Sequence, residues 1–365
     1  MDTMQAAGAV DGRPVRVLVV DDSAVMRQLV PALLREDPRI EVVGTAADAY
    51  IARNKIQRLD PDVLTLDVEM PRMDGLSFLR NLTRQHPMPV GMVSSLTEQG
   101  ASVTLDALAS GAVDFIGKPR AEAPEALAAY AAELRAKVLA AAQARVRATG
   151  PVRPSGPGTP PATRLAPARS QAPGLVVIGA STGGTEAIRQ VLAPLPADMP
   201  PVVIAQHIPA TFSAAFADRL DRHCALDVAQ AVDGEPLQPG RAYVAPGGRH
   251  LRVRRQHGAL RCVISDEPAP FRPSVDALFE SAAEHAGAAA CAALLTGMGS
   301  DGARGMLALR RAGARTIAQD KASSVVWGMP GAAVALSAAT DVVPLGEVAA
   351  MLLTRFPAGS VTGGT

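Results

Sequence analysis

Short apolar runs alternate with amphipathic stretches along the first 146 residues. Runs rich in Val, Ile and Leu, typical of strands, lie at 15–20, 41–44, 62–66, 89–93 and 112–116. Helical patterns separate these runs, and the Ala-rich stretch 124–146 follows the last of them. This alternation predicts a parallel sheet with helices on both faces. In such sheets the functional residues collect at the carboxyl ends of the strands.

The pattern is interrupted between residues 150 and 174, where the chain has seven prolines and no acidic residue. Such a segment buries too little apolar surface to offset the entropy of ordering it. It is therefore predicted to be a linker, either a mobile tether or an inert spacer. The expected divisions are a disordered N-terminus 1–13, a first domain 14–135, a helical extension and Pro-rich linker 136–173, a second domain 174–358 and a disordered tail 359–365.

Composition supports two domains and narrows the class of protein. A chain of 365 residues is longer than one ordinary domain. Hydrophobic residues make up 48% but aromatic residues only 3%, so the cores must be built from Ala, Val, Leu and Ile. A net charge of +1 gives no reason to expect binding to nucleic acid or a membrane surface. With no signal peptide and no run of about 18 apolar residues, we expect a cytoplasmic, monomeric protein that does not insert into membranes.

Polar residues stand at the ends of successive strands in the first domain. Asp21 and Asp22 follow the first strand, Asp67 ends the third, Ser94 ends the fourth and Lys118 follows the fifth. Three neighbouring carboxylates repel one another unless a cation lies among them, and an all-oxygen cluster suits Mg²⁺. Any one such acid is commonly a solvated loop residue. The five together favour a site where Asp67 attacks a phosphoryl group whose charge is neutralised by the metal and Lys118.

This half of the chain resembles a response-regulator receiver domain. The resemblance covers residues 14–135 and rests on four motifs: VDDS at 20–23, LDVEMPRMDG at 66–75, MVSS at 92–95 and FIGKP at 115–119. It implies a flavodoxin-like α/β fold and a chemotaxis histidine kinase as phosphodonor. The implied residues are the phosphoacceptor Asp67, the Mg²⁺ ligands Asp21, Asp22 and the backbone carbonyl of Glu69, the switch residues Ser94 and Phe115, and the phosphate partner Lys118.

The second domain opens with VVIGASTGGTEAI at 176–188, an apolar strand that runs into a helical pattern through Ser181. Its glycines, at 179, 183 and 184, do not fit the spacing of a dinucleotide-binding G-x-G-x-x-G motif, and the lysine of a phosphate-binding P-loop is missing. The stretch does fit G-x-S-x-G, a strained turn that exposes a nucleophilic serine. A helix N-terminus would then favour developing negative charge. On this motif alone, a simple N-cap role for Ser181 is equally open.

A nucleophilic serine needs a base and an orienting acid, and two further strand ends supply candidates. His207 directly follows the apolar run 202–206, and Asp301 follows the apolar run and Gly-rich turn of CAALLTGMGSDG. His250 is a weaker rival for the base. Ser181, His207 and Asp301 together favour a catalytic triad. Their chain order differs from the Ser, acid, His order of α/β-hydrolases, which disfavours that fold.

The second half resembles the catalytic domain of the chemotaxis protein-glutamate methylesterases. The motifs are IGASTGGTEAI at 178–188, VIAQHIPATFSAAFADRL at 203–220, YVAPGGRHL at 243–251, RPSVDALF at 272–279, LLTGMGSDGA at 294–303 and AQDKASSVVWGMPGAAV at 318–334. The resemblance implies a triad of Ser181, His207 and Asp301, lined by Thr182 and Met298. Two positions depart from it: Phe271 stands where the family often has histidine, and Lys321 where it often has an acid.

The resemblance also implies a fold and an activity. The fold would be a three-layer α/β/α, Rossmann-like catalytic domain, which makes the whole chain two doubly wound α/β domains. The activity would be hydrolysis of γ-glutamyl methyl esters on chemoreceptors, with release of methanol and no cofactor, and deamidation of receptor glutamines. We expect the unphosphorylated receiver to inhibit and phosphorylation of Asp67 to activate. The alternative is a receiver-controlled adaptor that binds receptors without turning them over.

Overall fold

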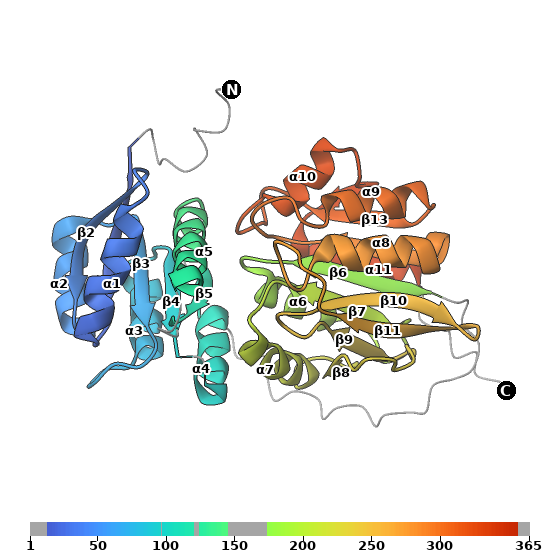
Figure 1. Cartoon of the computed structure of the whole chain (residues 1–365), viewed down its shortest axis with the longest axis horizontal. Coiled ribbons are helices and arrows are strands. Elements are labelled where there is room, and N and C mark those ends of the chain that lie inside the picture. The colour runs from blue at the N-terminus through green and yellow to red at the C-terminus, as the bar shows by residue number, and fades with distance from the viewer. Residues whose placement is uncertain (1–12, 96, 120–123, 145–173, 357–365) are drawn as a thin grey trace. The chain divides into compact units, whose positions relative to one another are not determined.

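The computed structural model describes residues 13–95, 97–119, 124–144 and 174–356, which fall into two compact units, one before and one after the proline-rich segment (Figure 1). The predicted tail 359–365, nearly all of the predicted N-terminal segment and most of the predicted linker lie outside the described residues. Within those ranges no helix is long and apolar enough to cross a membrane.

The first unit is a five-stranded parallel sheet with the strand order β2-β1-β3-β4-β5. Helices α1 and α5 pack together, and so do α3 and α4. Right-handed crossovers place α1 and α5 on one face and α2, α3 and α4 on the other. The elements are β1 (Val15–Val20), α1 (Ala24–Arg35), β2 (Ile40–Ala46), α2 (Ala49–Leu59), β3 (Val63–Asp67), α3 (Gly75–Gln85), β4 (Val90–Ser94), α4 (Glu98–Ala109), β5 (Asp114–Gly117) and α5 (Pro124–Ala142).

All five strands expected in this unit are present, with bounds that differ by at most two residues at either end. Their apolar side chains fill both faces of the sheet, as the near-continuous apolar runs predict for parallel strands. Arg13, expected in the disordered N-terminus, forms an ion pair with Asp62 at 2.7 Å, so the described structure begins before the predicted boundary.

The second unit is a seven-stranded parallel sheet with the order β14-β13-β12-β6-β7-β9-β8. An antiparallel hairpin, β10–β11, is a separate sheet that the sequence analysis does not predict. The elements are β6 (Leu175–Ala180), α6 (Gly184–Leu192), β7 (Val202–Gln206), α7 (Ala210–Asp221), β8 (Asp227–Gln230), β9 (Arg241–Val244), β10 (His250–Gln256), β11 (Ala259–Ser265), α8 (Val275–His285), β12 (Ala290–Leu294), α9 (Ala303–Arg311), β13 (Arg315–Gln319), α10 (Met329–Ala335), β14 (Asp341–Val343) and α11 (Leu345–Arg355).

Helices cover both faces of this sheet and give it three layers (Figure 1). Helix α6 packs with α7 and α11, whereas α9 packs with α8 and α10. The strand order reverses at β6, because the chain passes from β6 to β7 on one side and later places β12 on the other. Such a switch point leaves a crevice at the carboxyl ends of the strands, where α/β proteins bind their ligands.

The core of the second unit is made mostly of Ala, Val, Leu and Ile, as the low aromatic content predicts. Strands β6, β7 and β12 are buried along their whole length. Four aromatic side chains, Tyr243, Phe212, Phe216 and Phe279, are nevertheless fully buried. This packing fixes the three central strands whose carboxyl ends carry the candidate site.

Candidate active site

Ser181 lies in the turn directly after β6 and is held by its backbone on both sides. Its N–H donates to the carbonyl of Thr296 at 3.0 Å, and its carbonyl accepts from the N–H of Gly184 at 2.7 Å and from Nε2 of Gln206 at 2.9 Å. The neighbouring strands are in register, with Ala180 opposite Gln206. The serine hydroxyl is therefore presented by a rigid turn.

The structure changes two sequence interpretations of this turn. Helix α6 is capped by Gly183 rather than by Ser181, so the serine is not an N-cap. The left-handed residue of the turn is also Gly183, with φ of 75°, and Ser181 is not among the residues with positive φ. The prediction of a strained turn at the serine is therefore wrong. The positive φ falls on Gly183, and glycine adopts such an angle without a steric penalty.

His207 follows β7 and its ring lies between the two other candidate residues. Its Nδ1 is 3.1 Å from Oγ of Ser181, and its Nε2 is 2.8 Å from Oδ2 of Asp301. Since a carboxylate only accepts hydrogen bonds, Nε2 carries the proton and Nδ1 is left to accept from the serine hydroxyl. The side chain is mostly buried. The structure thus brings together the three side chains that the sequence selected.

Asp301 is buried and held by more than the histidine. Its Oδ2 also accepts from the N–H of Val275 at 2.7 Å, and its Oδ1 accepts from Oγ of Ser274 and the N–H of Asp276, both at 3.0 Å. Burial favours the neutral acid, but the hydrogen bond and charge of His207 and these amides hold the pKa of Asp301 below its usual value. The carboxylate therefore lies at the N-terminus of α8, where the helix dipole favours negative charge.

The loop after β12 passes close to Ser181. Gly297 lies so close to Ser181 that a methyl group on it would be 2.8 Å from the serine Cβ. Its N–H donates to the carbonyl of Val326 at 3.0 Å, which fixes the peptide next to Met298. Within the described parts of the chain, the Met298 N–H has no acceptor, whereas the N–H of Ser181 donates to the carbonyl of Thr296. Thr182, the next residue after Ser181, is buried, and its carbonyl accepts from Oγ1 of Thr296 at 3.0 Å.

Gln206 is a residue of the site that the sequence analysis did not select. Gln206, buried beside His207, donates to the carbonyls of both Ser181 and His207. His250, the weaker rival for the base, is buried elsewhere in the unit, where it contacts Ser274 and Glu267. Gln206 could have been noticed, because a polar residue at the end of a buried strand needs a hydrogen-bond partner.

The two departures from the family pattern lie beside this site. Phe271 stacks on the ring of His207, with ring centroids 4.6 Å apart. Lys321 lies over the ring of Trp327 at 6.0 Å, and the backbone of Trp327 pairs with that of Gly297.

In the first unit, the acids at the carboxyl ends of β1 and β3 form one cluster. Oxygen atoms of Asp21, Asp22 and Asp67 all lie within 4.8 Å of one another. Lys118 reaches into the cluster, with Nζ 2.8 Å from Asp67 and 3.4 Å from Asp21. Burial raises the pKa of Asp67 to about 6. The hydrogen bond from Lys118 lowers this pKa, whereas the negative charge of Asp21 raises it further. A single lysine therefore leaves negative charge uncompensated, and the all-oxygen donor set fits Mg²⁺.

The remaining residues expected around the phosphoacceptor are placed more indirectly. The N–H of Glu69 donates to Oδ1 of Asp67 at 3.3 Å, so the backbone of Glu69 lies next to the cluster. Ser94 is buried and its hydroxyl accepts from Oγ1 of Thr104 at 2.7 Å.

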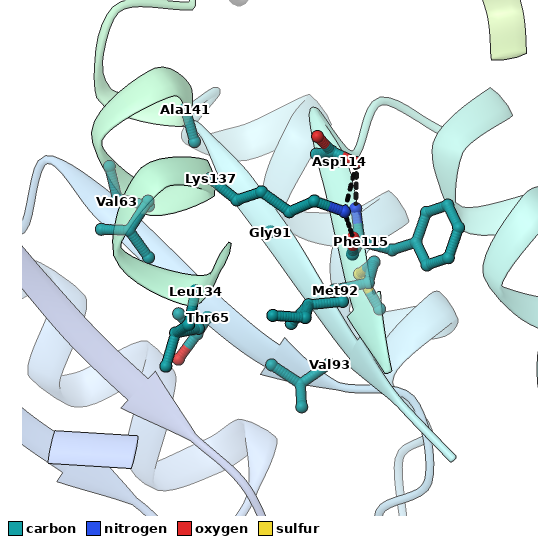
Figure 2. Close-up of a pocket in the computed structure, with 12 residues that line it drawn as sticks. Val63, Thr65, Gly91, Met92, Val93, Asp114, Phe115, Leu134, Lys137 and Ala141 are labelled. Carbon is teal, nitrogen blue, oxygen red and sulfur yellow. Dashed lines mark hydrogen bonds and ion pairs between the residues drawn. The ribbon is translucent and has the colours of Figure 1, made fainter. Parts of the chain in front are cut away.

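Phe115 is buried under the last helix of the unit. Figure 2 shows Lys137 of α5 reaching across a pocket to Asp114 and to the backbone carbonyl of Phe115. The ammonium group is 3.5 Å from the Asp114 carboxylate and 5.1 Å from the centre of the Phe115 ring. Lys137 therefore links the position of β5 to that of α5.

Comparisons with known proteins agree with both halves of the chain. Residues 176–352 match the CheB methylesterase family model, and residues 17–130 match the response regulator receiver domain. A protein-glutamate methylesterase/protein-glutamine glutaminase of Xanthomonas oryzae pv. oryzae is 57% identical over 93% of this chain and 97% of its own length. A relative of the same name from Hahella chejuensis is 53% identical over 93% of this chain and 96% of its own length.

One solved structure illustrates the similarity of the second half. The Thermotoga maritima CheB methylesterase catalytic domain is 36% identical and covers 50% of this chain and 99% of its own, with a TM-score of 0.49. With relatives above 50% identity along nearly the full length of both proteins, the chain belongs to the family of the protein-glutamate methylesterase/protein-glutamine glutaminases.

Proposed function

We propose that this protein is a receiver-controlled hydrolase that removes methyl groups from γ-glutamyl methyl esters of chemoreceptors and deamidates receptor glutamines. The observation that carries the proposal is the position of His207, which lies within hydrogen-bond distance of both Ser181 and Asp301. The relatives bear the names of these two activities.

The distances around His207 support a role for a particular atom in each step of ester hydrolysis. Oγ of Ser181 attacks the ester carbonyl carbon, and its proton passes to Nδ1 of His207. The imidazolium that forms is stabilised by the Asp301 carboxylate through Nε2. The N–H of Met298 is the proposed donor to the carbonyl oxygen as that oxygen gains negative charge.

Collapse of the tetrahedral intermediate breaks the bond to the methoxy group, which takes the proton from Nδ1 of His207 and leaves as methanol. Water then attacks the acyl-enzyme, gives one proton to Nδ1 and releases the glutamate side chain as Ser181 recovers its hydrogen. With a glutamine substrate, the leaving group is ammonia. No step needs a cofactor.

The first unit would control this activity through Asp67 as phosphoacceptor. Asp21, Asp22 and the backbone carbonyl of Glu69 would hold Mg²⁺, which when bound neutralises charge on the incoming phosphoryl group. Lys118 already contacts Asp67 and would pair with the phosphate. Ser94 and Phe115 would rearrange in response. A chemotaxis histidine kinase is the proposed phosphodonor, and receptors with cytoplasmic glutamyl sites place the reaction in the cytoplasm.

The alternative, an adaptor that binds receptors without turning them over, is not favoured. Such a protein has no need for an aspartate that accepts four hydrogen bonds in a buried site and orients a histidine toward a serine.

The test uses the full chain and membranes that carry receptors labelled in their methyl groups. The wild type should release volatile methanol, faster after phosphorylation, and a fluorophosphonate should label Ser181. Ser181→Ala should lose both the methanol release and the label. Substantial methanol release by that variant would overturn the assignment of the nucleophile. A wild type that neither releases methanol nor is labelled at Ser181 would favour the adaptor.

A further inference from the structure

An exposed aromatic ring lies flat on the base of the proposed triad. The planes of Phe271 and His207 differ by 8°, with 4.6 Å between ring centroids. This distance is at the short end of the range in which aromatic pairs attract each other. Phe271 is still 43% exposed, so its placement is not explained by burial in the core.

The loop that carries this ring is tied down at both ends by a buried histidine. Nδ1 of His250 accepts from the N–H of Ser274 at 3.2 Å, and its Nε2 donates to the carbonyl of Glu267 at 3.0 Å. The carbonyl of Arg272, next to the ring, accepts from the N–H of Gly248 at 3.0 Å. His250 is only 1% exposed, so its two hydrogen bonds are made by a buried ring, and together with the contact to Gly248 they restrain the loop that carries Phe271.

The other end of the same loop leads into the hydrogen bonds of the acid. Ser274 donates to Asp301, and the next two backbone amides do the same. One short segment therefore contacts the acid through its amides and the base through the ring of Phe271.

We propose that Phe271 is a positioning residue for the ring of His207. This proposal rests on the proposed hydrolase function. The stack holds the His207 ring in the one orientation in which Nδ1 faces Ser181 and Nε2 faces Asp301. When His207 takes the serine proton it becomes a cation, and the electron-rich face of an aromatic ring attracts a cation placed over it. The contact is thus stronger in the charged state that forms during reaction than in the resting state, and it increases the rate.

Matched variants distinguish the effect of the aromatic face of Phe271 from the effect of its size. Phe271→Leu keeps an apolar side chain but removes the π face, whereas Phe271→Tyr and Phe271→Trp keep an aromatic face. Val232→Ala is the control, because Val232 is an exposed apolar side chain of the same unit, 63% accessible, outside the site. Thermal unfolding followed by circular dichroism should give the same midpoint for all four variants and the wild type.

Two readouts on the full chain distinguish positioning from receptor contact. One is the second-order rate constant for labelling of Ser181 by a small fluorophosphonate, which needs the base but no receptor. The other is kcat and KM for methanol release from methylated receptor membranes. Phe271→Leu should lower the labelling rate constant and kcat by the same factor, about two- to fivefold, with KM unchanged. That factor corresponds to roughly 0.5–1 kcal/mol at about 1.36 kcal/mol per tenfold change in rate.

Restoration of both rates by Phe271→Tyr or Phe271→Trp would support the proposal, as would wild-type rates in Val232→Ala. A wild-type labelling rate in Phe271→Leu, or a change confined to KM, would overturn it and assign the ring to receptor binding. Equal impairment of the Leu and Tyr variants would also overturn it. Labelling that persists in Ser181→Ala would instead refute the hydrolase function, so the two failures are distinguishable.

Discussion

Replacement of Asp301 by asparagine separates the charge of the acid from its role in orienting the base. The Oδ2 side of the carboxylate faces two donors, Nε2 of His207 and the N–H of Val275. The Oδ1 side faces the N–H of Asp276 and the hydroxyl of Ser274, and a hydroxyl can also accept. An asparagine should therefore turn its amide group toward Ser274 and keep its carbonyl on His207.

The expected loss follows from this orientation. The base keeps its tautomer, so only the attraction between the imidazolium and the carboxylate is lost. At about 4 Å and an effective dielectric constant near 20 that attraction is about 4 kcal/mol, or roughly 10³-fold in rate. Asp301→Ala also loses the orientation and should fall by about 10⁴-fold. In Asp301→Asn the N–H of Asp276 loses its acceptor, which should lower the free energy of unfolding by about 1–3 kcal/mol.

The assay is methanol release from labelled receptors by the wild type and both variants, with urea unfolding measured in parallel. Both variants should still be labelled slowly by a fluorophosphonate, because Ser181 is intact. A rate for Asp301→Asn within threefold of the wild type would refute the role of the charge. Equal rates for the Asn and Ala variants would refute the predicted orientation.

Three further predictions concern the ionisation of Asp301, the close approach of Gly297 to Ser181, and the acidic cluster of the first unit. Because the pKa of Asp301 is lowered in the folded protein, the stability it contributes should be fully present above its unfolded pKa of about 3.9 and be lost as the pH falls below that value. The gap in unfolding free energy between the wild type and Asp301→Asn should therefore narrow between pH 6 and pH 3, and a constant gap would contradict this. Gly297→Ala should press on Ser181 and on the sulfur of Met329, slow fluorophosphonate labelling and cost about 1–3 kcal/mol of unfolding free energy. Gly346→Ala is the control: its added methyl meets open space in the first turn of α11, so it should leave labelling unchanged and should not lower the free energy of unfolding, because alanine is the better helix former. Mg²⁺ at 100 times its Kd should stabilise the first unit by about 2.7 kcal/mol. The melting temperature should therefore be higher in Mg²⁺ than in EDTA. Asp21→Asn should reduce this shift in melting temperature, and an equal shift in that variant would exclude Asp21 as a ligand.

The sequence was most informative where polar residues follow continuous apolar runs. Strands β6 and β7 are buried throughout, so the polar residues that follow them, Ser181 and His207, had to lie at the same edge of the sheet. The same reasoning placed Asp67 in the first unit, at the end of a fully buried strand. These positions are fixed by local patterns and by the geometry of parallel sheets.

The sequence was least informative where the site depends on contacts between distant loops. Asp301 stands just before the helix that follows it, but Gly302 caps α9, and the Asp301 carboxylate accepts hydrogen bonds from the start of α8, a different helix. The stack of Phe271 on His207 depends on a loop held by His250, which no local pattern encodes. Similarly, the small residues around Ser181 indicated a tight turn but not that Gly183 would adopt the left-handed angle.

The orientation of the His207 ring has a consequence for inhibitor design. Reagents that bridge a serine and a histidine, such as haloketones, alkylate the ring nitrogen on the serine side after the hydroxyl has added to them. In the familiar triad that nitrogen is Nε2, at the outer end of the ring. Here it is Nδ1, next to the carbon that joins the ring to the chain, and the approach is more crowded. Compounds shaped to this shorter and more angled path would discriminate between this enzyme and hydrolases with the opposite ring orientation.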